Sequence, residues 1–97
     1  MIEALKPENH TALVIASVCN DIRDLLLKKN LKYGNAALDP IRIFSNASAK
    51  EQLLVRIDDK LNRIKQGNNL IDEDEDVVTD LIGYLILLTV WKRENEW

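Results

Sequence analysis

The chain has 97 residues, of which 46% are hydrophobic and 30% are charged, with only three glycines and two prolines. This composition predicts one globular domain, residues 1–97, and excludes disordered and fibrous proteins. The formal charge of −3 includes no basic surplus, so nucleic-acid binding is not expected.

A first helix is predicted from about Pro7 to Tyr33, and Gly34 is a natural stop. Its apolar residues recur at helical spacing. They are Ile15, Val18, Cys19, Ile22, Leu25 and Leu26. Cys19 is the only cysteine, which excludes an intrachain disulfide and fits a reducing compartment. Its place in the apolar pattern predicts a buried hydrophobic side chain and not a nucleophile.

A connection of about a dozen residues follows, from Asn35 to Ala47. Asp39 and Pro40 open a turn, and three apolar residues are expected to hold the loop against the core. They are Ile41, Ile43 and Phe44. A loop of this length in so small a domain indicates either a functional segment or an irregular lid.

The second helix is predicted to begin at Ser48, which forms a capping box with Glu51, and to end at Gly67. One apolar stripe runs along it, made of Leu53, Leu54, Ile57, Leu61 and Ile64. At 100° per residue, Glu51 and Asp58 lie together on one flank of this stripe. The basic residues Arg56, Lys60 and Arg63 lie on the other side.

The third helix is predicted from a capping signal at Asp72 and Glu75 to about Lys92. Apolar residues occupy nearly all of its sides, and a three-helix monomer cannot bury a helix all round. We therefore expect an all-α helical bundle of three main helices, completed by homo-oligomerisation as a dimer or a tetramer. The apolar run Leu81–Trp91 is too short to span a bilayer, so a cytoplasmic protein without membrane contact is expected.

Asp76 and Asp80 are four residues apart, so their carboxylates lie on one helical face, and Tyr84 continues that face. Two carboxylates at this spacing can hold a hard cation such as Mg²⁺. Glu51 and Asp58 could supply further ligands if their flank faces the third helix. The alternative is structural: Asp76 complements the helix dipole, and Asp80 accepts a salt bridge from Arg56, Lys60 or Arg63.

Two further sets of residues could bind a phosphate-bearing ligand. Lys32 and Tyr33, at a helix–loop junction, can contact phosphate and base, although dipole-complementary lysines beside a C-capping glycine are equally expected. Arg56, Lys60 and Arg63 form a cationic stripe that suits an anion, or simply the solvated face of an amphipathic helix.

Several motifs occur together in one order: Lys32-Tyr33-Gly34, then Ile43-Phe44, then residues 56–64 (RIDDKLNRI), then residues 75–84 (EDVVTDLIGY). In this order they resemble small phage and prophage helical proteins of the nucleotide-modification-associated type. These in turn are similar to the MazG-like all-α nucleoside triphosphate pyrophosphohydrolases. The resemblance covers roughly residues 20–90.

The resemblance implies an oligomeric, nucleotide-handling helical bundle and possible Mg²⁺-dependent pyrophosphohydrolase activity. Asp76 and Asp80 would be the catalytic, metal-holding pair, with Asp58 and Glu51 as further metal ligands. Phosphates would contact Lys32, Arg56, Lys60 and Arg63, and base or sugar would contact Tyr33 or Tyr84. The family's E-x-x-E pair is absent here, so the alternative is a non-catalytic protein that sequesters a nucleotide or binds a host protein.

Overall fold

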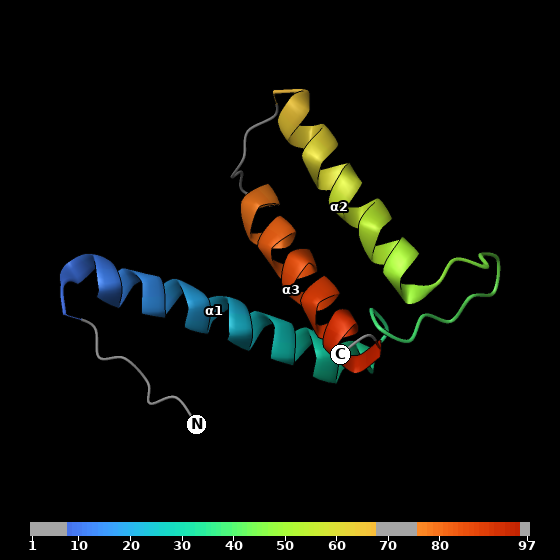
Figure 1. Ribbon diagram of the computed structural model, residues 1–97, viewed down its shortest axis with the longest axis horizontal. Coiled ribbons are helices and arrows are strands. Elements are labelled where there is room, and N and C mark those ends of the chain that lie inside the picture. The colour runs from blue at the N-terminus through green and yellow to red at the C-terminus, as the bar shows by residue number, and fades with distance from the viewer. Residues whose placement is uncertain (1–7, 68–75, 96–97) are drawn as a thin grey trace.

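The computed structural model describes residues 8–67 and 76–95 and contains three α-helices in these two ranges (Figure 1). They are α1 (His10–Tyr33), α2 (Ala49–Lys65) and α3 (Val77–Asn95). Neither range contains a β-strand, which confirms the predicted all-α class. Within the same ranges, no helix combines the length and apolar character that crossing a membrane requires.

The ends of α1 are set by local hydrogen bonds. The Asn9 side chain accepts a hydrogen bond of 2.8 Å from the backbone N–H of Ala12, so it caps the helix N-terminus. Gly34 ends the helix in the left-handed region (φ 61°), and its N–H donates to the carbonyl of Asn30. The predicted end at Tyr33 is confirmed, whereas the predicted start at Pro7 lies outside the described residues.

The second and third helices are also capped by side chains from their own sequence. Ser48 Oγ accepts a hydrogen bond of 3.1 Å from the Glu51 N–H, as the capping motif predicts. At the start of α3, Asp76 accepts a hydrogen bond of 2.9 Å from the Thr79 N–H, and its backbone carbonyl accepts from the Asp80 N–H. The cap predicted at Asp72 and Glu75 lies outside the described residues.

Helices α2 and α3 lie side by side and antiparallel (Figure 1). Three contacts define the register: Lys50 lies over the ring of Trp91, Arg56 over the ring of Tyr84, and Lys60 beside Asp80. Along these contacts the residue number rises in α2 and falls by a similar amount in α3, as in an antiparallel pair. Between the two helices lie the buried side chains Ala49, Leu53, Ile57 and Val77.

Only the C-terminal half of α1 packs against the other helices, where it crosses α3. The N-terminal half of α1 extends away from α2 and α3 (Figure 1). Gly83 of α3 lies at the crossing, where a Cβ atom would sit 3.3 Å from Leu26 Cδ2. Ile22 is buried next to this contact. The radius of gyration is 15.7 Å, against about 12.5 Å for a compact domain of this length.

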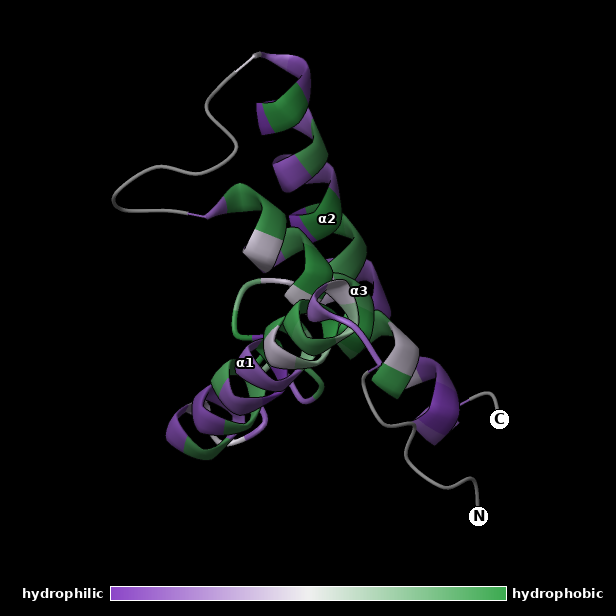
Figure 2. Cartoon of the chain, turned by 90° about the vertical axis from the view of Figure 1, so that its left-hand side faces the viewer, coloured by the Kyte–Doolittle hydropathy of each residue, from purple (hydrophilic) through white to green (hydrophobic). Residues whose placement is uncertain are grey.

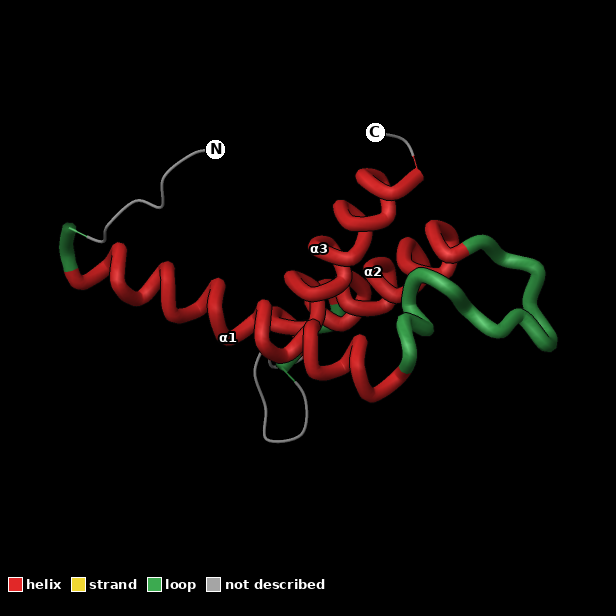
Figure 3. The backbone as a smooth tube through the Cα atoms, turned by 90° about the horizontal axis from the view of Figure 1, so that it is seen from below, coloured by secondary structure: helices red, strands yellow, loops and turns green. Residues whose placement is uncertain are grey.

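Two predictions about burial are wrong. Cys19 is exposed, because it lies on the part of α1 that extends beyond α3. The loop residues Ile41, Ile43 and Phe44 are exposed as well, because the loop between α1 and α2 projects away from the helices (Figure 3). Apolar residues cover most of α3 (Figure 2), and Leu85, Ile86 and Val90 remain exposed. Whether a second subunit covers this helix stays a prediction.

Candidate functional site

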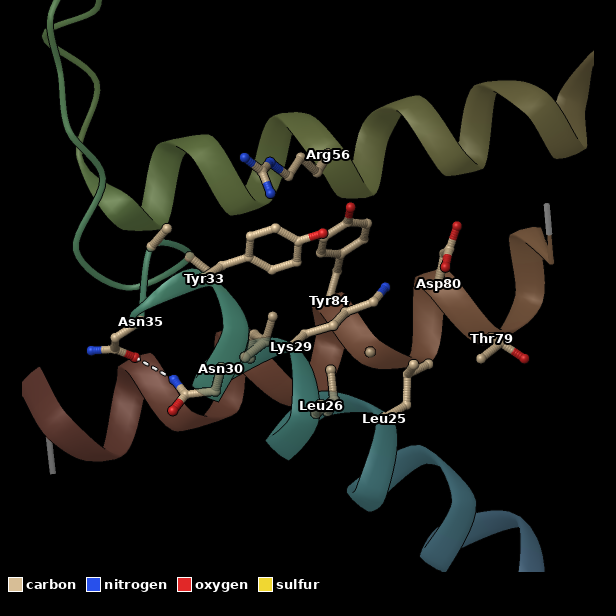
Figure 4. A pocket seen from close by; sticks show the side chains of 14 residues that line it. Leu25, Leu26, Lys29, Asn30, Tyr33, Asn35, Arg56, Thr79, Asp80 and Tyr84 are labelled. Carbon is tan, nitrogen blue, oxygen red and sulfur yellow. Dashed lines mark hydrogen bonds between the residues drawn. The ribbon is translucent and has the colours of Figure 1, made fainter. Parts of the chain in front are cut away.

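A cavity of about 420 Å³ lies where the three helices meet (Figure 4). Its walls come from the C-terminal end of α1 with the following turn, from the middle of α2 and from the first turns of α3. Its polar lining consists of Lys29, Asn30, Tyr33, Asn35, Arg56, Thr79, Asp80 and Tyr84. Its apolar lining consists of Leu25, Leu26, Ala36, Ala37, Gly83 and Leu87.

Two tyrosines and one arginine form the upper part of the cavity (Figure 4). Tyr33 is the last residue of α1, and Tyr84 lies in the second turn of α3. The guanidinium carbon of Arg56 lies 5.9 Å from the centre of the Tyr84 ring, within cation–π range. The two rings therefore line one cavity from different helices, and Arg56 lies over the ring of Tyr84.

The turn after α1 shapes the other end of the cavity. Gly34 and Asn35 both adopt positive φ angles (61° and 66°), so the chain reverses immediately after Tyr33. The Asn30 side-chain amide donates a hydrogen bond of 2.8 Å to Asn35 Oδ1, which ties the turn to the helix (Figure 4). This local geometry brings Ala36 and Ala37 back against the cavity.

The charged groups in the lining leave two cations without an acidic partner. Within residues 8–67 and 76–95, neither Lys29 nor Arg56 takes part in an ion pair. Asp80, the one carboxylate in the described lining, is 3.2 Å from the ammonium of Lys60, and both side chains are partly buried. The cavity is therefore suited to a ligand that carries negative charge.

Asp76 caps the N-terminus of α3 and does not line the cavity. Its carboxylate accepts hydrogen bonds from the hydroxyl and the N–H of Thr79. These hydrogen bonds hold the pKa of Asp76 below its ordinary value of 3.8, because they stabilise the ionised carboxylate. The bond from the Thr79 hydroxyl has the larger effect, and the bond from the Thr79 N–H has the smaller one. The contacts that the structural alternative expects are present: Asp76 caps the helix terminus and Asp80 forms a salt bridge with Lys60. A metal at these carboxylates stays a prediction.

The four predicted metal ligands do not come together within one chain. Glu51 and Asp58 are exposed on α2, Asp76 caps α3, and Asp80 faces Lys60. No group of three or more His, Cys, Asp or Glu side chains among the described residues is arranged to hold a metal ion. The reason is the register of α2 against α3, which turns Arg56 and Lys60 toward α3 in place of the acidic flank.

The predicted phosphate-binding cations divide into two groups. Arg56 lines the cavity. Lys60 does not line it but forms a salt bridge with Asp80, which does. Lys32 is exposed and stacks on the adjacent Tyr33 ring at 5.2 Å, and Arg63 is exposed near the end of α2. Of the ten predicted site residues, the cavity brings together Tyr33, Arg56, Asp80 and Tyr84.

Four polar residues of the lining were not predicted: Lys29, Asn30, Asn35 and Thr79. For Lys29 a signal was present, because it lies four residues before Tyr33 and four after Leu25, so all three share one face of α1. For Asn35 the position depends on the tight turn at Gly34, which helical periodicity does not describe.

Comparison of the chain with protein-family models, with curated proteins and with solved structures found no match. The resemblance to MazG-like proteins therefore stays a prediction. The function has to be inferred from the geometry of the cavity.

Proposed function

We propose that this protein binds a nucleotide in the cavity between α1, α2 and α3. The observation that supports this most directly is the convergence of Tyr33 and Tyr84 with Lys29 and Arg56, two cations that have no acidic partner among the described residues. A nucleotide joins a flat aromatic base to an anionic phosphate. Tyrosine rings pack against the first, and guanidinium and ammonium groups bind the second.

The dimensions and chemistry of the cavity agree with a ligand of this kind. Its volume of about 420 Å³ falls within the usual range for small-molecule sites, about 300–1,000 Å³. The leucines of its lining offer apolar surface to a base, and the Asn30 and Asn35 amides offer hydrogen-bonding groups. Arg56 is the residue we expect to contact phosphate, because its planar guanidinium can make two parallel hydrogen bonds to it.

We place binding ahead of hydrolysis. A Mg²⁺-dependent pyrophosphohydrolase would need several carboxylates around its metal, and the predicted set is dispersed over α2 and α3. Among the described residues, the lining contains no histidine or cysteine that could act as a nucleophile or base. Mg²⁺-dependent hydrolysis, with Asp80 as a metal ligand, is the alternative, and an assay of released pyrophosphate on the same protein and nucleotides tests it.

The experiment is isothermal titration with nucleoside mono-, di- and triphosphates, each in the presence of Mg²⁺ and of EDTA. We expect binding in both conditions, and Arg56→Gln should weaken it about 10–100-fold through loss of a charge-assisted hydrogen bond. The matched control is Arg63→Gln, which removes the same charge from the same helix but outside the cavity. It should leave the affinity almost unchanged.

Three outcomes would contradict the proposal. The first is that no nucleotide binds at millimolar concentration. The second is an equal loss of affinity in Arg56→Gln and Arg63→Gln, which would indicate non-specific attraction to a basic helix. The third is release of pyrophosphate that requires Mg²⁺ and is abolished by Asp80→Asn in a variant that keeps its helicity, which would establish the hydrolase instead.

The second candidate is an interaction protein that binds a host factor. One observation favours it: the loop between α1 and α2 presents Ile41, Ile43 and Phe44 to solvent. Clustered apolar side chains on a projecting loop are typical of protein-binding surfaces. Under this alternative, Phe44→Ser abolishes partner binding and leaves the nucleotide affinity unchanged.

A further inference from the structure

The N-terminal half of α1 carries an apolar stripe that the described parts of the chain leave uncovered. Val14 and Ile15 lie three and four residues after Thr11, and Val18 lies four and three residues after them, so all four share one face of the helix. Ile15 is 60% exposed and Val18 is 47% exposed. A shallow apolar hollow of about 360 Å³ runs along this face.

The stripe continues the side of α1 that packs against α3. One turn beyond Val18, Ile22 falls on the same face and is only 7% exposed, and Leu26 follows it into the contact with Gly83. Burial therefore stops where α1 passes the edge of α3, while the apolar pattern does not (Figure 1). The apolar face of α1 is thus continuous from its N-terminal half into the contact with α3, as in a helix that packs against a neighbour along its whole length.

The charge pattern of the stripe favours a second copy of this chain as the occupant. Residues 11–20 include no acidic or basic side chain. In a two-fold symmetric contact each residue near the axis meets its own copy, so any charge there would meet a like charge. A neutral apolar segment avoids this repulsion, and it offers no charged group that would select a different partner.

We propose that two copies of this chain pair through the N-terminal halves of their α1 helices, packed antiparallel across a two-fold axis near Ile15. Ile15 lies in the middle of the uncovered stripe, so an antiparallel pair centred there covers the stripes of both copies. Antiparallel pairing also sets the helix dipoles in opposite directions. The cavity residues Lys29 and Tyr33 lie at the other end of α1, so this proposal does not depend on nucleotide binding.

The first test is the mass of the full-length protein in solution, measured by light scattering or sedimentation at tens of micromolar. We expect a mass of twice 11.1 kDa for the unaltered chain. Ile15→Glu should weaken the dimer about 100-fold or more, since it buries an unpaired carboxylate from each copy at the axis. The matched control is Leu31→Glu, which places the same charge on an 86% exposed leucine on the opposite face of α1. It should leave the dimer intact.

The second test does not require the interface to be disrupted. In a Cys19→Ser background, Ile15→Cys should form a disulfide-linked dimer on mild oxidation, because the two thiols meet at the axis. Leu31→Cys in the same background should stay monomeric on a denaturing gel. A monomeric unaltered chain, a dimer that persists in Ile15→Glu, or equal cross-linking at positions 15 and 31 would each overturn the proposal.

Discussion

At the scale of single residues, the start of α3 depends on Asp76. Its carboxylate accepts hydrogen bonds from both the N–H and the hydroxyl of Thr79. The same carboxylate lies at the positive end of the helix dipole, where negative charge is favourable. Asp76 therefore stabilises α3 both by accepting hydrogen bonds and by its negative charge, and the two contributions can be separated by substitution.

We predict that Asp76→Ala lowers the melting temperature by about 4–8 °C at neutral pH, because the Thr79 N–H loses its acceptor. Asp76→Asn should lower it less, since an amide oxygen can still accept that hydrogen bond. Thermal unfolding followed by circular dichroism measures both. Equal losses in the two variants would contradict the capping role.

The pH dependence tests the charge separately. Because the pKa of Asp76 is lowered in the folded protein, the ionised side chain contributes stability above its ordinary pKa of 3.8. That contribution is lost as the pH falls through the lowered value. The difference in melting temperature between the unaltered chain and Asp76→Asn should be largest at pH 5–7 and should shrink below about pH 3.8. A difference that stays constant down to pH 2 would rule the charge effect out.

At the scale of elements, the crossing of α1 over α3 positions one wall of the cavity. Gly83 lets the two helices approach closely, with Leu26 in contact. Lys29 and Tyr33 lie one and two turns beyond Leu26 on α1, and Tyr84 is adjacent to Gly83 on α3. A change in the helix separation at the crossing therefore changes the distance between the two tyrosines.

We predict that Gly83→Leu weakens nucleotide binding about tenfold or more, because a branched side chain forces α1 away from α3. Gly83→Ala is the matched control. Its Cβ meets only the end of the flexible Leu26 side chain, and alanine favours the helix, so stability should change by less than about 1 kcal/mol. Titration with nucleotide and chemical denaturation measure the two effects. Unchanged affinity in Gly83→Leu would separate the crossing from the site.

At the scale of the whole molecule, the core is small. The buried apolar residues in the described ranges are Ile22, Ala49, Leu53, Ile57 and Val77. Leu53 is the most enclosed of them, with 1% of its surface exposed. Most of the stability of a single copy therefore comes from the contact between α2 and α3, and α1 contributes through one short crossing.

We predict that Leu53→Ala lowers the free energy of unfolding by about 2–5 kcal/mol, because it leaves a cavity at the centre of the α2–α3 contact. Val55→Ala, on the exposed side of the same helix, should change it by less than about 1 kcal/mol. Urea denaturation at a fixed protein concentration measures both. A similar loss in the two variants would place the core elsewhere.

Local sequence signals specify the helices and most of their ends. The caps at Ser48 and Gly34 and the apolar periodicity of α2 involve residues within four positions of one another, so they can be recognised without knowing the fold. The same local reasoning predicted that Asp76 and Asp80 share a face of α3. It left open whether that face holds a metal or a structural contact.

Which residues of different helices contact one another depends on how the helices pack. The antiparallel register of α2 on α3 places Lys60 beside Asp80 and Arg56 over Tyr84, and it leaves Glu51 and Asp58 in solvent. The angle of α1 exposes Cys19 and the stripe around Ile15, although both fit a buried pattern. These outcomes depend on contacts between residues far apart in the chain, whose geometry is set by packing and not by local periodicity.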